Sequence, residues 1–111
     1  IAGMVGCYLG AAICQMPILI DGFISAVSAY LACMLNQTAK EYMIPTHCSA
    51  EPAAKMIMEK LGMEAPLHAG MHLGEGTGAI MGLSLIDQAL NVYYHVATFE
   101  GGHVEAYTHQ V

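Results

Sequence analysis

The chain has 111 residues, of which 56% are hydrophobic and 11% are charged, and its formal net charge is -6. This length suffices for one domain with a modest core. Because such a core cannot bury so many apolar side chains, we expect another part of the protein or a partner to cover some of the apolar surface. Three lysines and no arginine stand against nine carboxylates. This balance excludes a nucleic-acid groove, because phosphate backbones are held by clustered basic side chains.

The start of the chain is uncharged. It begins at Ile1, without an initiator methionine or the basic flank of a signal peptide, which suggests a segment of a longer protein. Residues 1–20 carry no charge and could span a bilayer by length. Pro17 interrupts this run, so we predict no transmembrane helix. We expect instead a buried helix over residues 2–14 and a central strand over residues 17–21.

Helices and strands alternate along the rest of the chain. We expect an Ala-rich helix over 25–35, a strand over 43–47, and a helix over 53–61 that starts after Pro52 and ends at Gly62. A short segment around 66–69 follows as a third strand, then a helix over 79–94 and a polar, mobile tail from Glu100. This alternation predicts an α/β fold, a three-layer Rossmann-like parallel sheet flanked by helices.

Ligands of open parallel sheets bind outside the carboxyl ends of the strands. Three candidate segments follow the expected strands: Asp21-Gly22, His47-Cys48-Ser49 and Gly74-Glu75-Gly76. We therefore expect them to converge on one site. Asp21 could also be a solvated carboxylate or the cap of the next helix.

Glu75 lies in a glycine-rich run, from His72 to Ala79, directly ahead of a helix. Glycine amides at a helix start suit an anion such as phosphate. With no arginine in the chain, either these amides with the hydroxyls of Ser49 and Thr77 would hold it, or a lysine outside this segment would. Because a carboxylate repels phosphate, Glu75 is expected to handle a proton or a cationic centre instead. The alternative is a surface turn in which Glu75 caps the helix.

The cysteines and histidines indicate neither a disulfide nor a metal site. Cys7, Cys14 and Cys33 lie in apolar helical stretches and are expected to be buried, which leaves Cys48 as the one candidate for reactivity. No Cys-x-x-Cys pair occurs, which favours a reducing cytoplasm. The pair His68 and His72 falls on a strand end or loop, so we predict no metal site.

Five ordered segments resemble a known family. In order and approximate spacing they are similar to the C-terminal part of nicotinate-nucleotide:dimethylbenzimidazole phosphoribosyltransferases. The segments are Ile1-Ala2-Gly3-Met4-Val5-Gly6, Pro17-Ile18-Leu19-Ile20-Asp21-Gly22-Phe23-Ile24-Ser25, His47-Cys48-Ser49-Ala50-Glu51-Pro52, Leu73-Gly74-Glu75-Gly76-Thr77-Gly78-Ala79 and Ala97-Thr98-Phe99. The resemblance implies that residues 1–99 form the C-terminal part of the family's α/β domain, followed by a polar tail over 100–111.

The resemblance also implies a reaction. The family moves phosphoribosyl from nicotinate mononucleotide to a ring nitrogen of 5,6-dimethylbenzimidazole, giving α-ribazole phosphate and nicotinate in cobalamin synthesis, with no metal or other cofactor. Glu75 matches the catalytic base that takes the azole proton. The resemblance implies the following substrate contacts: Leu73 on the benzimidazole, Asp21, Ser49 and Gly78 on the nucleotide, and Glu51, Gly74 and Gly76 shaping the pocket. We further expect a cytoplasmic homodimer that binds no nucleic acid and no membrane.

The chain departs from the family at Cys48, where an Arg is common, and at Ala54, which replaces a common His. Since family members are several times longer, we expect the isolated segment to be inactive without its missing N-terminal portion. A non-catalytic scaffold that retains the fold is the alternative. A dinucleotide oxidoreductase is disfavoured, because Gly74, Gly76 and Gly78 are spaced by two and do not form G-x-G-x-x-G.

Overall fold

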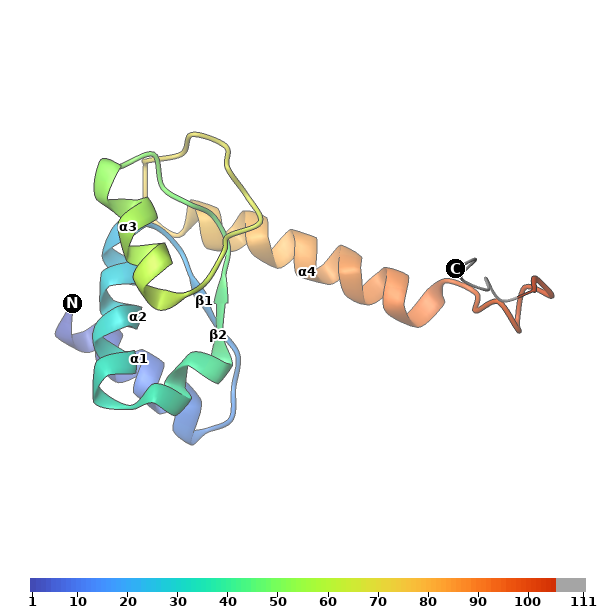
Figure 1. Cartoon of the computed structure of the whole chain (residues 1–111), viewed down its shortest axis with the longest axis horizontal. Helices are drawn as coiled ribbons and strands as arrows, with labels where there is room; N and C mark the ends of the chain where they lie inside the picture. The colour runs from blue at the N-terminus through green and yellow to red at the C-terminus, as the bar shows by residue number, and fades with distance from the viewer. Residues whose placement is uncertain (106–111) are drawn as a thin grey trace, which may run out of the picture.

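A computed structural model describes residues 1–105 of the chain. It contains five helical segments and two strands (Figure 1). In chain order these are α1 (Ala2–Ile13), β1 (Ile18–Ile20), α2 (Phe23–Leu35), the 3-10 helix η1 (Gln37–Tyr42), β2 (Met43–Pro45), α3 (Pro52–Leu61) and α4 (Thr77–His95). The α/β class expected from the sequence is confirmed.

The sheet is smaller than expected. β1 and β2 pair in parallel, with Ile18 opposite Met43 and Ile20 opposite Pro45. The expected third strand is reduced to a single parallel bridge between His47 and Leu67. Its flanks explain why, because Pro66 has no amide to donate and Gly70 takes a left-handed conformation with φ of 65°. The prediction of a third strand is therefore wrong.

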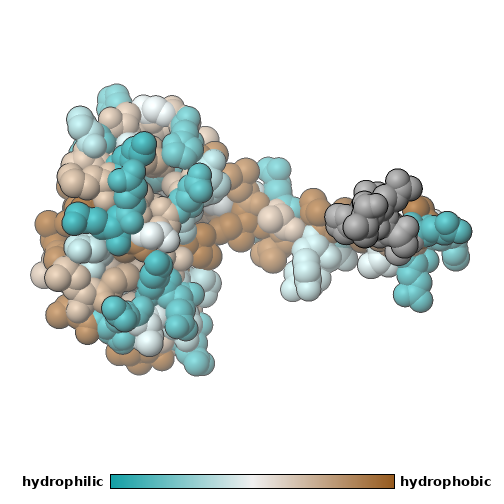
Figure 2. Space-filling view, viewed as in Figure 1, coloured by the Kyte–Doolittle hydropathy of each residue, from teal (hydrophilic) through white to brown (hydrophobic). Residues whose placement is uncertain are grey.

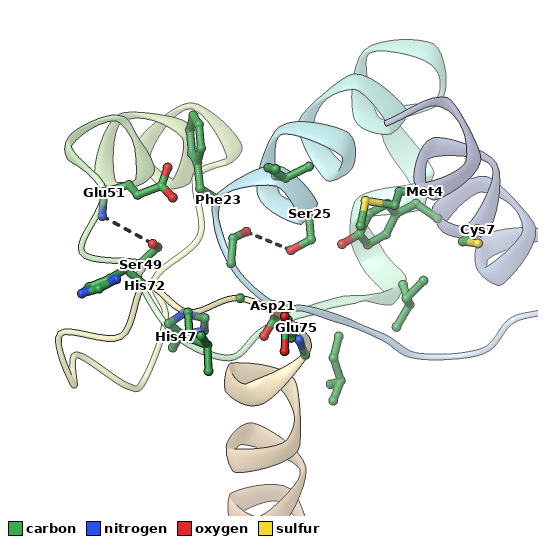
Figure 3. A pocket seen from close by; sticks show the side chains of 18 residues that line it. Met4, Cys7, Asp21, Phe23, Ser25, His47, Ser49, Glu51, His72 and Glu75 are labelled. Atoms are coloured by element: carbon green, nitrogen blue, oxygen red, sulfur yellow. Dashed lines mark hydrogen bonds between the residues drawn. The ribbon is translucent and has the colours of Figure 1, made fainter.

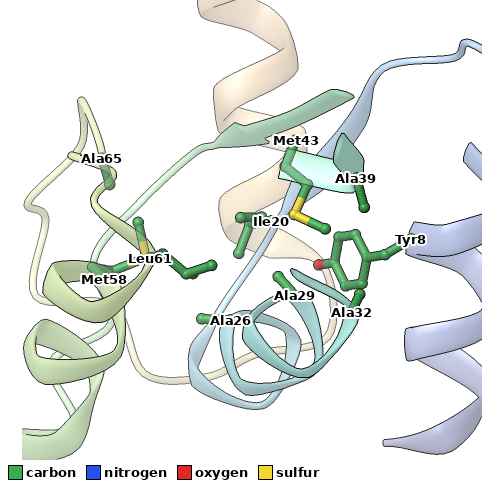
Figure 4. Packing of buried hydrophobic residues seen from close by; sticks show 10 residues of the cluster. All are labelled: Tyr8, Ile20, Ala26, Ala29, Ala32, Ala39, Met43, Met58, Leu61 and Ala65. Atoms are coloured by element: carbon green, nitrogen blue, oxygen red, sulfur yellow. The ribbon is translucent and has the colours of Figure 1, made fainter. Parts of the chain in front are cut away.

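The core lies between the sheet and the helices α1, α2 and α3, which occupy one side of the sheet (Figures 1 and 4). Ala29 and Ala32 of α2 are completely buried, and such small side chains let neighbouring elements approach closely. Tyr8, Ile20 and Met43 fill the space around them. The first turns of α4 pack on the other side of the sheet, where Gly82 lies directly against the side chain of Thr46. The layers thus follow the expected order around only two strands.

Local sequence signals placed α3 accurately. Pro52 is its first residue and Gly62 ends it in a left-handed conformation with φ of 61°, as the proline and the glycine predicted. The sequence did not predict η1. Its start is stabilised by Asn36, whose side-chain oxygen accepts a hydrogen bond of 3.1 Å from the Thr38 amide.

The expectation that α1 is a buried helix is wrong. Only Tyr8 and Ala11 are buried, because α1 contacts the rest of the chain along one face. Cys7 and Cys14 are consequently exposed, which also corrects the expectation for these thiols, while Cys33 is half-buried. The helices that residues 1–105 form are all too short or too polar to cross a membrane.

Most of α4 extends away from the body of the molecule (Figure 1). The radius of gyration is 17.2 Å, whereas a compact chain of this length has about 13 Å. Beyond Gly82, brown apolar side chains stay uncovered along much of the helix (Figure 2), among them Leu83, Leu90 and Val92. Residues 100–105 of the expected polar tail are exposed, and residues 106–111 lie outside the described part of the chain.

Tyr8 generates a prediction about alkaline stability. Burial raises the pKa of its phenol from the ordinary 10.0 to about 12. Between these values the folded chain keeps a proton that the unfolded chain has released, so stability falls as the pH rises from about 10 to about 12. Denaturant unfolding at a series of alkaline pH values should show this loss. Tyr8→Phe should reduce it, while the half-buried thiol of Cys33, whose pKa burial also raises, keeps its own contribution. An identical decline in the variant would contradict the assignment.

Candidate active site

A cavity of about 510 Å³ opens beside the carboxyl ends of β1 and β2. It brings together seven of the eight residues expected at the site: Asp21, Ser49, Glu51, Leu73, Gly74, Glu75 and Gly76. Figure 3 shows Asp21 and Glu75 above the start of α4, with Ser49 and Glu51 at the start of α3. The predicted convergence of the three strand-end segments is therefore confirmed in geometry, and the eighth residue, Gly78, lies outside the lining.

Backbone hydrogen bonds hold the three segments together. The Thr46 amide and its side-chain hydroxyl both donate to the carbonyl of Ile20, the hydroxyl at 2.6 Å. Further along, the Cys48 amide donates to Leu67 and the Ala50 amide to Met71. The residues before the glycine loop, 67–71, thus run alongside the residues after β2, 48–50. This pairing places the glycine loop at the end of β1.

Asp21 ties the end of β1 to the start of α4. One carboxylate oxygen accepts a hydrogen bond of 2.9 Å from the Ala79 amide, and the other accepts one of 3.2 Å from the Gly76 amide. Unpaired amides and the helix dipole make a helix N-terminus favourable for a negative charge. Asp21 is therefore a helix cap, as one alternative allowed, although it caps α4 rather than the next helix along the chain.

This contact argues against the phosphate expected at the glycine loop. Two of the amides that would hold it already bind the Asp21 carboxylate. The hydroxyl of Thr77 donates to the Gly74 carbonyl at 2.9 Å, and Thr77 does not line the cavity. The chain thus supplies its own anion at the start of α4.

The backbone of Glu75 is strained. Its φ is 56°, between Gly74 at 75° and Gly76 at 79°, so three consecutive residues are left-handed. A side chain other than glycine, Asn or Asp is disfavoured there by roughly 1–2 kcal/mol. Such strain persists where the surroundings enforce it, and it gathers at functional sites. The loop presents the Glu75 carboxylate, which is exposed, at the cavity.

Gly78 acts through packing. A Cβ atom at this position would overlap the imidazole ring of His47. Only glycine therefore lets the first turn of α4 lie against that ring. His47 is itself 4% exposed and lines the cavity. The sequence placed it in one of the three segments but did not select it as a site residue, although its position after a strand was the available signal.

The cavity is acidic and partly apolar. Among the described residues, the carboxylates of Asp21, Glu51 and Glu75 line it, and no lysine does. Met4, Phe23 and Leu73 are among its apolar lining residues, and nothing in the sequence linked Met4 to the site. Negative charge beside apolar walls favours a flat aromatic group that carries a proton or a positive charge, and it disfavours an anion.

Other candidates lie apart from this cavity. Cys48, the one cysteine expected to be reactive, borders a separate hollow with Lys55 and His68. Within residues 1–105, no group of three histidine, cysteine, aspartate or glutamate side chains is placed to hold a metal ion.

The Asp21 contact predicts a change in local dynamics. Asp21→Asn removes the negative charge at the start of α4 and at least one of the two acceptors, so the glycine loop should open more often. We expect the Gly76 and Ala79 amides to exchange with solvent roughly tenfold faster. Hydrogen exchange measured by NMR checks this. Glu51→Gln is the matched control, since Glu51 lines the same cavity without bonding the loop, and equal effects of both changes would refute the capping role.

Comparison with known proteins gives the family. The sequence profile of the family described as "Phosphoribosyltransferase" matches residues 1–104. The chain is 48% identical over 111 residues to the nicotinate-nucleotide–dimethylbenzimidazole phosphoribosyltransferase of Acetivibrio thermocellus, covering 100% of this chain and 32% of that protein. It is 50% identical over 107 residues to the protein of the same name from Clostridium acetobutylicum, covering 96% of this chain and 30% of that one.

A solved structure agrees. The crystal structure of the phosphoribosyltransferase of this name from Thermus thermophilus superposes with a TM-score of 0.85 and 31% identity, covering 93% of this chain and 31% of that one. The chain thus spans about a third of the length of its relatives, and its place within that length stays a prediction. Its matched region, its identity to these relatives and its fold lead to one conclusion. The chain belongs to the nicotinate-nucleotide:dimethylbenzimidazole phosphoribosyltransferase family.

Proposed function

We propose that the chain forms part of an enzyme that transfers phosphoribosyl from nicotinate mononucleotide to 5,6-dimethylbenzimidazole, with Glu75 as the general base. The observation that carries this proposal is the Glu75 carboxylate, held by a strained backbone at an acidic, partly apolar cavity. The relatives from Acetivibrio thermocellus and Clostridium acetobutylicum carry that activity in their names. The products would be α-ribazole phosphate and nicotinate.

The chemistry needs one base. Glu75 would take the N–H proton of the azole while the other ring nitrogen attacks the anomeric carbon. The bond between that carbon and the nicotinate nitrogen breaks, and its electron pair neutralises the pyridinium ring that leaves. Asp21 and Glu51 would add negative charge near the cationic ring before transfer. Leu73, which is 71% exposed, would pack on the azole.

The phosphate would bind elsewhere. Because Asp21 occupies the start of α4, and no lysine lines the cavity, we infer that residues outside this chain hold the phosphate. Ser49 and Gly76 would then border the nucleotide near its ribosyl group, while Gly74 and Gly78 give the loop its shape.

The apolar surface of α4 supports a larger assembly. We infer that residues 1–99 form one part of the α/β domain of a longer protein and that this protein is a homodimer. The rest of the same chain, the second subunit, or both would cover the apolar surface of α4. The four cysteines of the 111-residue chain are free. This fits a reducing cytoplasm.

Glu75→Gln tests the role of the base. In a full-length protein that carries this chain, the amide cannot take the azole proton, so kcat should fall by roughly a hundredfold or more while nucleotide affinity changes little. Turnover is measured as α-ribazole phosphate formed, and affinity by calorimetry with nicotinate mononucleotide. Thr77→Ser, outside the cavity, is the control. An unchanged kcat in Glu75→Gln would remove Glu75 as base.

The isolated chain should be inactive. Without the residues that would hold the phosphate, positioning of the nucleotide is lost even where Glu75 is present. The same product assay on the 111-residue chain should give no turnover above background under conditions where the full-length protein is active. Turnover near that of the full-length protein would contradict the division of the site.

A further inference from the structure

His47 lies at the centre of the candidate active site. Its ring is held between two glycines, because a Cβ atom on Gly22 would lie 3.9 Å from ring atom Cε1 and one on Gly78 would overlap the ring. The parallel bridge to Leu67 fixes its backbone. In Figure 3 His47 lies beside Asp21 and Glu75, above the start of α4. Its side chain is therefore in place before any ligand arrives.

The two ring nitrogens differ in their surroundings. Within residues 1–105, Nδ1 is fully enclosed and has no hydrogen-bond partner. A buried N–H without an acceptor is rarer and costs more than a buried lone pair, so in the neutral ring the proton belongs on Nε2. No described residue accepts a hydrogen bond from Nε2, and this nitrogen is not among the enclosed atoms. Its N–H thus has no partner among the described residues, and the ring that carries it lines the cavity.

The charge of the cavity selects the acceptor. Asp21, Glu51 and Glu75 all border the cavity, so a ligand phosphate would meet repulsion that one neutral N–H does not offset. A hydroxyl oxygen suits the same place, because it can accept from His47 and donate its own hydrogen to a carboxylate. The ribosyl part of a nucleotide carries such hydroxyls beside the anomeric carbon.

We propose that His47 is a substrate-binding residue that donates its Nε2–H to a ribosyl hydroxyl of the bound nucleotide. This inference rests on the proposed phosphoribosyl transfer and adds a contact to it. The contact would hold the ribosyl group while the base acts, so it contributes to nucleotide binding rather than to proton transfer.

Two substitutions of His47 separate its nitrogens. In the full-length protein, His47→Gln can place an amide N–H near the position of Nε2, whereas His47→Asn places its amide near Nδ1. We expect His47→Asn to raise the KM for nicotinate mononucleotide roughly tenfold, the loss of one hydrogen bond, with kcat and the KM for the azole within about twofold. His47→Gln should stay near the parent protein. Cys48→Ala, next to His47 and outside the cavity, is the matched control.

Deoxy analogues identify the partner. The 2′-deoxy or the 3′-deoxy form of nicotinate mononucleotide should bind the parent protein roughly tenfold more weakly in calorimetry, and His47→Asn should lose this discrimination. If the variant still discriminates both analogues as the parent does, or if its KM is unchanged, the proposal is wrong. Equal increases in both substrate KM values would indicate a structural role and also overturn it. A parent protein that binds the nucleotide without transfer would overturn the proposed function alone.

Discussion

The carboxylate of Asp21 at the start of α4 organises the rest of the site. It binds the amides of Gly76 and Ala79, which lie 55 and 58 positions further along the sequence. These amides are at a helix start, where unpaired amides and positive potential are concentrated. The hydrogen bond from Gly76 also fixes one end of the loop that carries Glu75. Together with the hydrogen bonds from Thr77 to the Gly74 carbonyl, this anchor holds three successive left-handed residues in that conformation.

The same contact decides which chemistry the cavity can favour. A helix N-terminus filled by the chain's own carboxylate no longer attracts a ligand anion. The remaining carboxylates of Glu51 and Glu75 then set a negative potential over an apolar wall. Such a surface favours a pyridinium ring before transfer and an azole that loses a proton during it. Under the proposed function, phosphate recognition and base chemistry would thereby be separated in space, so that a glutamate and a phosphate could serve one reaction without opposing each other.

Sequence reasoning succeeded where the governing interactions are local. Pro52 and Gly62 predicted the limits of α3, because proline fixes its own φ and glycine tolerates the left-handed conformation that ends the helix. The strand ends predicted which segments would meet. The partners of Asp21 could not be predicted from the sequence. They lie far along the chain and are backbone amides, which every residue except proline has. The resemblance pointed to Gly78, but its packing against His47 also depends on a residue far away in the sequence. The prediction that Cys7 and Cys14 are buried was wrong. An apolar helix face does not reveal whether the described residues or another part of the protein cover it.

The exposed length of α4 follows from the same division between local and distant interactions. Its first turns are fixed by glycines, because Gly78 admits the ring of His47 and Gly82 admits Thr46. Beyond them, within residues 1–105, only Leu85, Ile86 and Ala89 share a hollow with Ile44, Pro45 and Pro66. Exposed apolar side chains nevertheless continue along the helix to Val92. A helix with such a surface is stabilised by packing rather than by propensity alone. The first turns therefore set the position of Glu75, while the partner surface that covers the remainder would hold the direction of α4 and, through it, the loop.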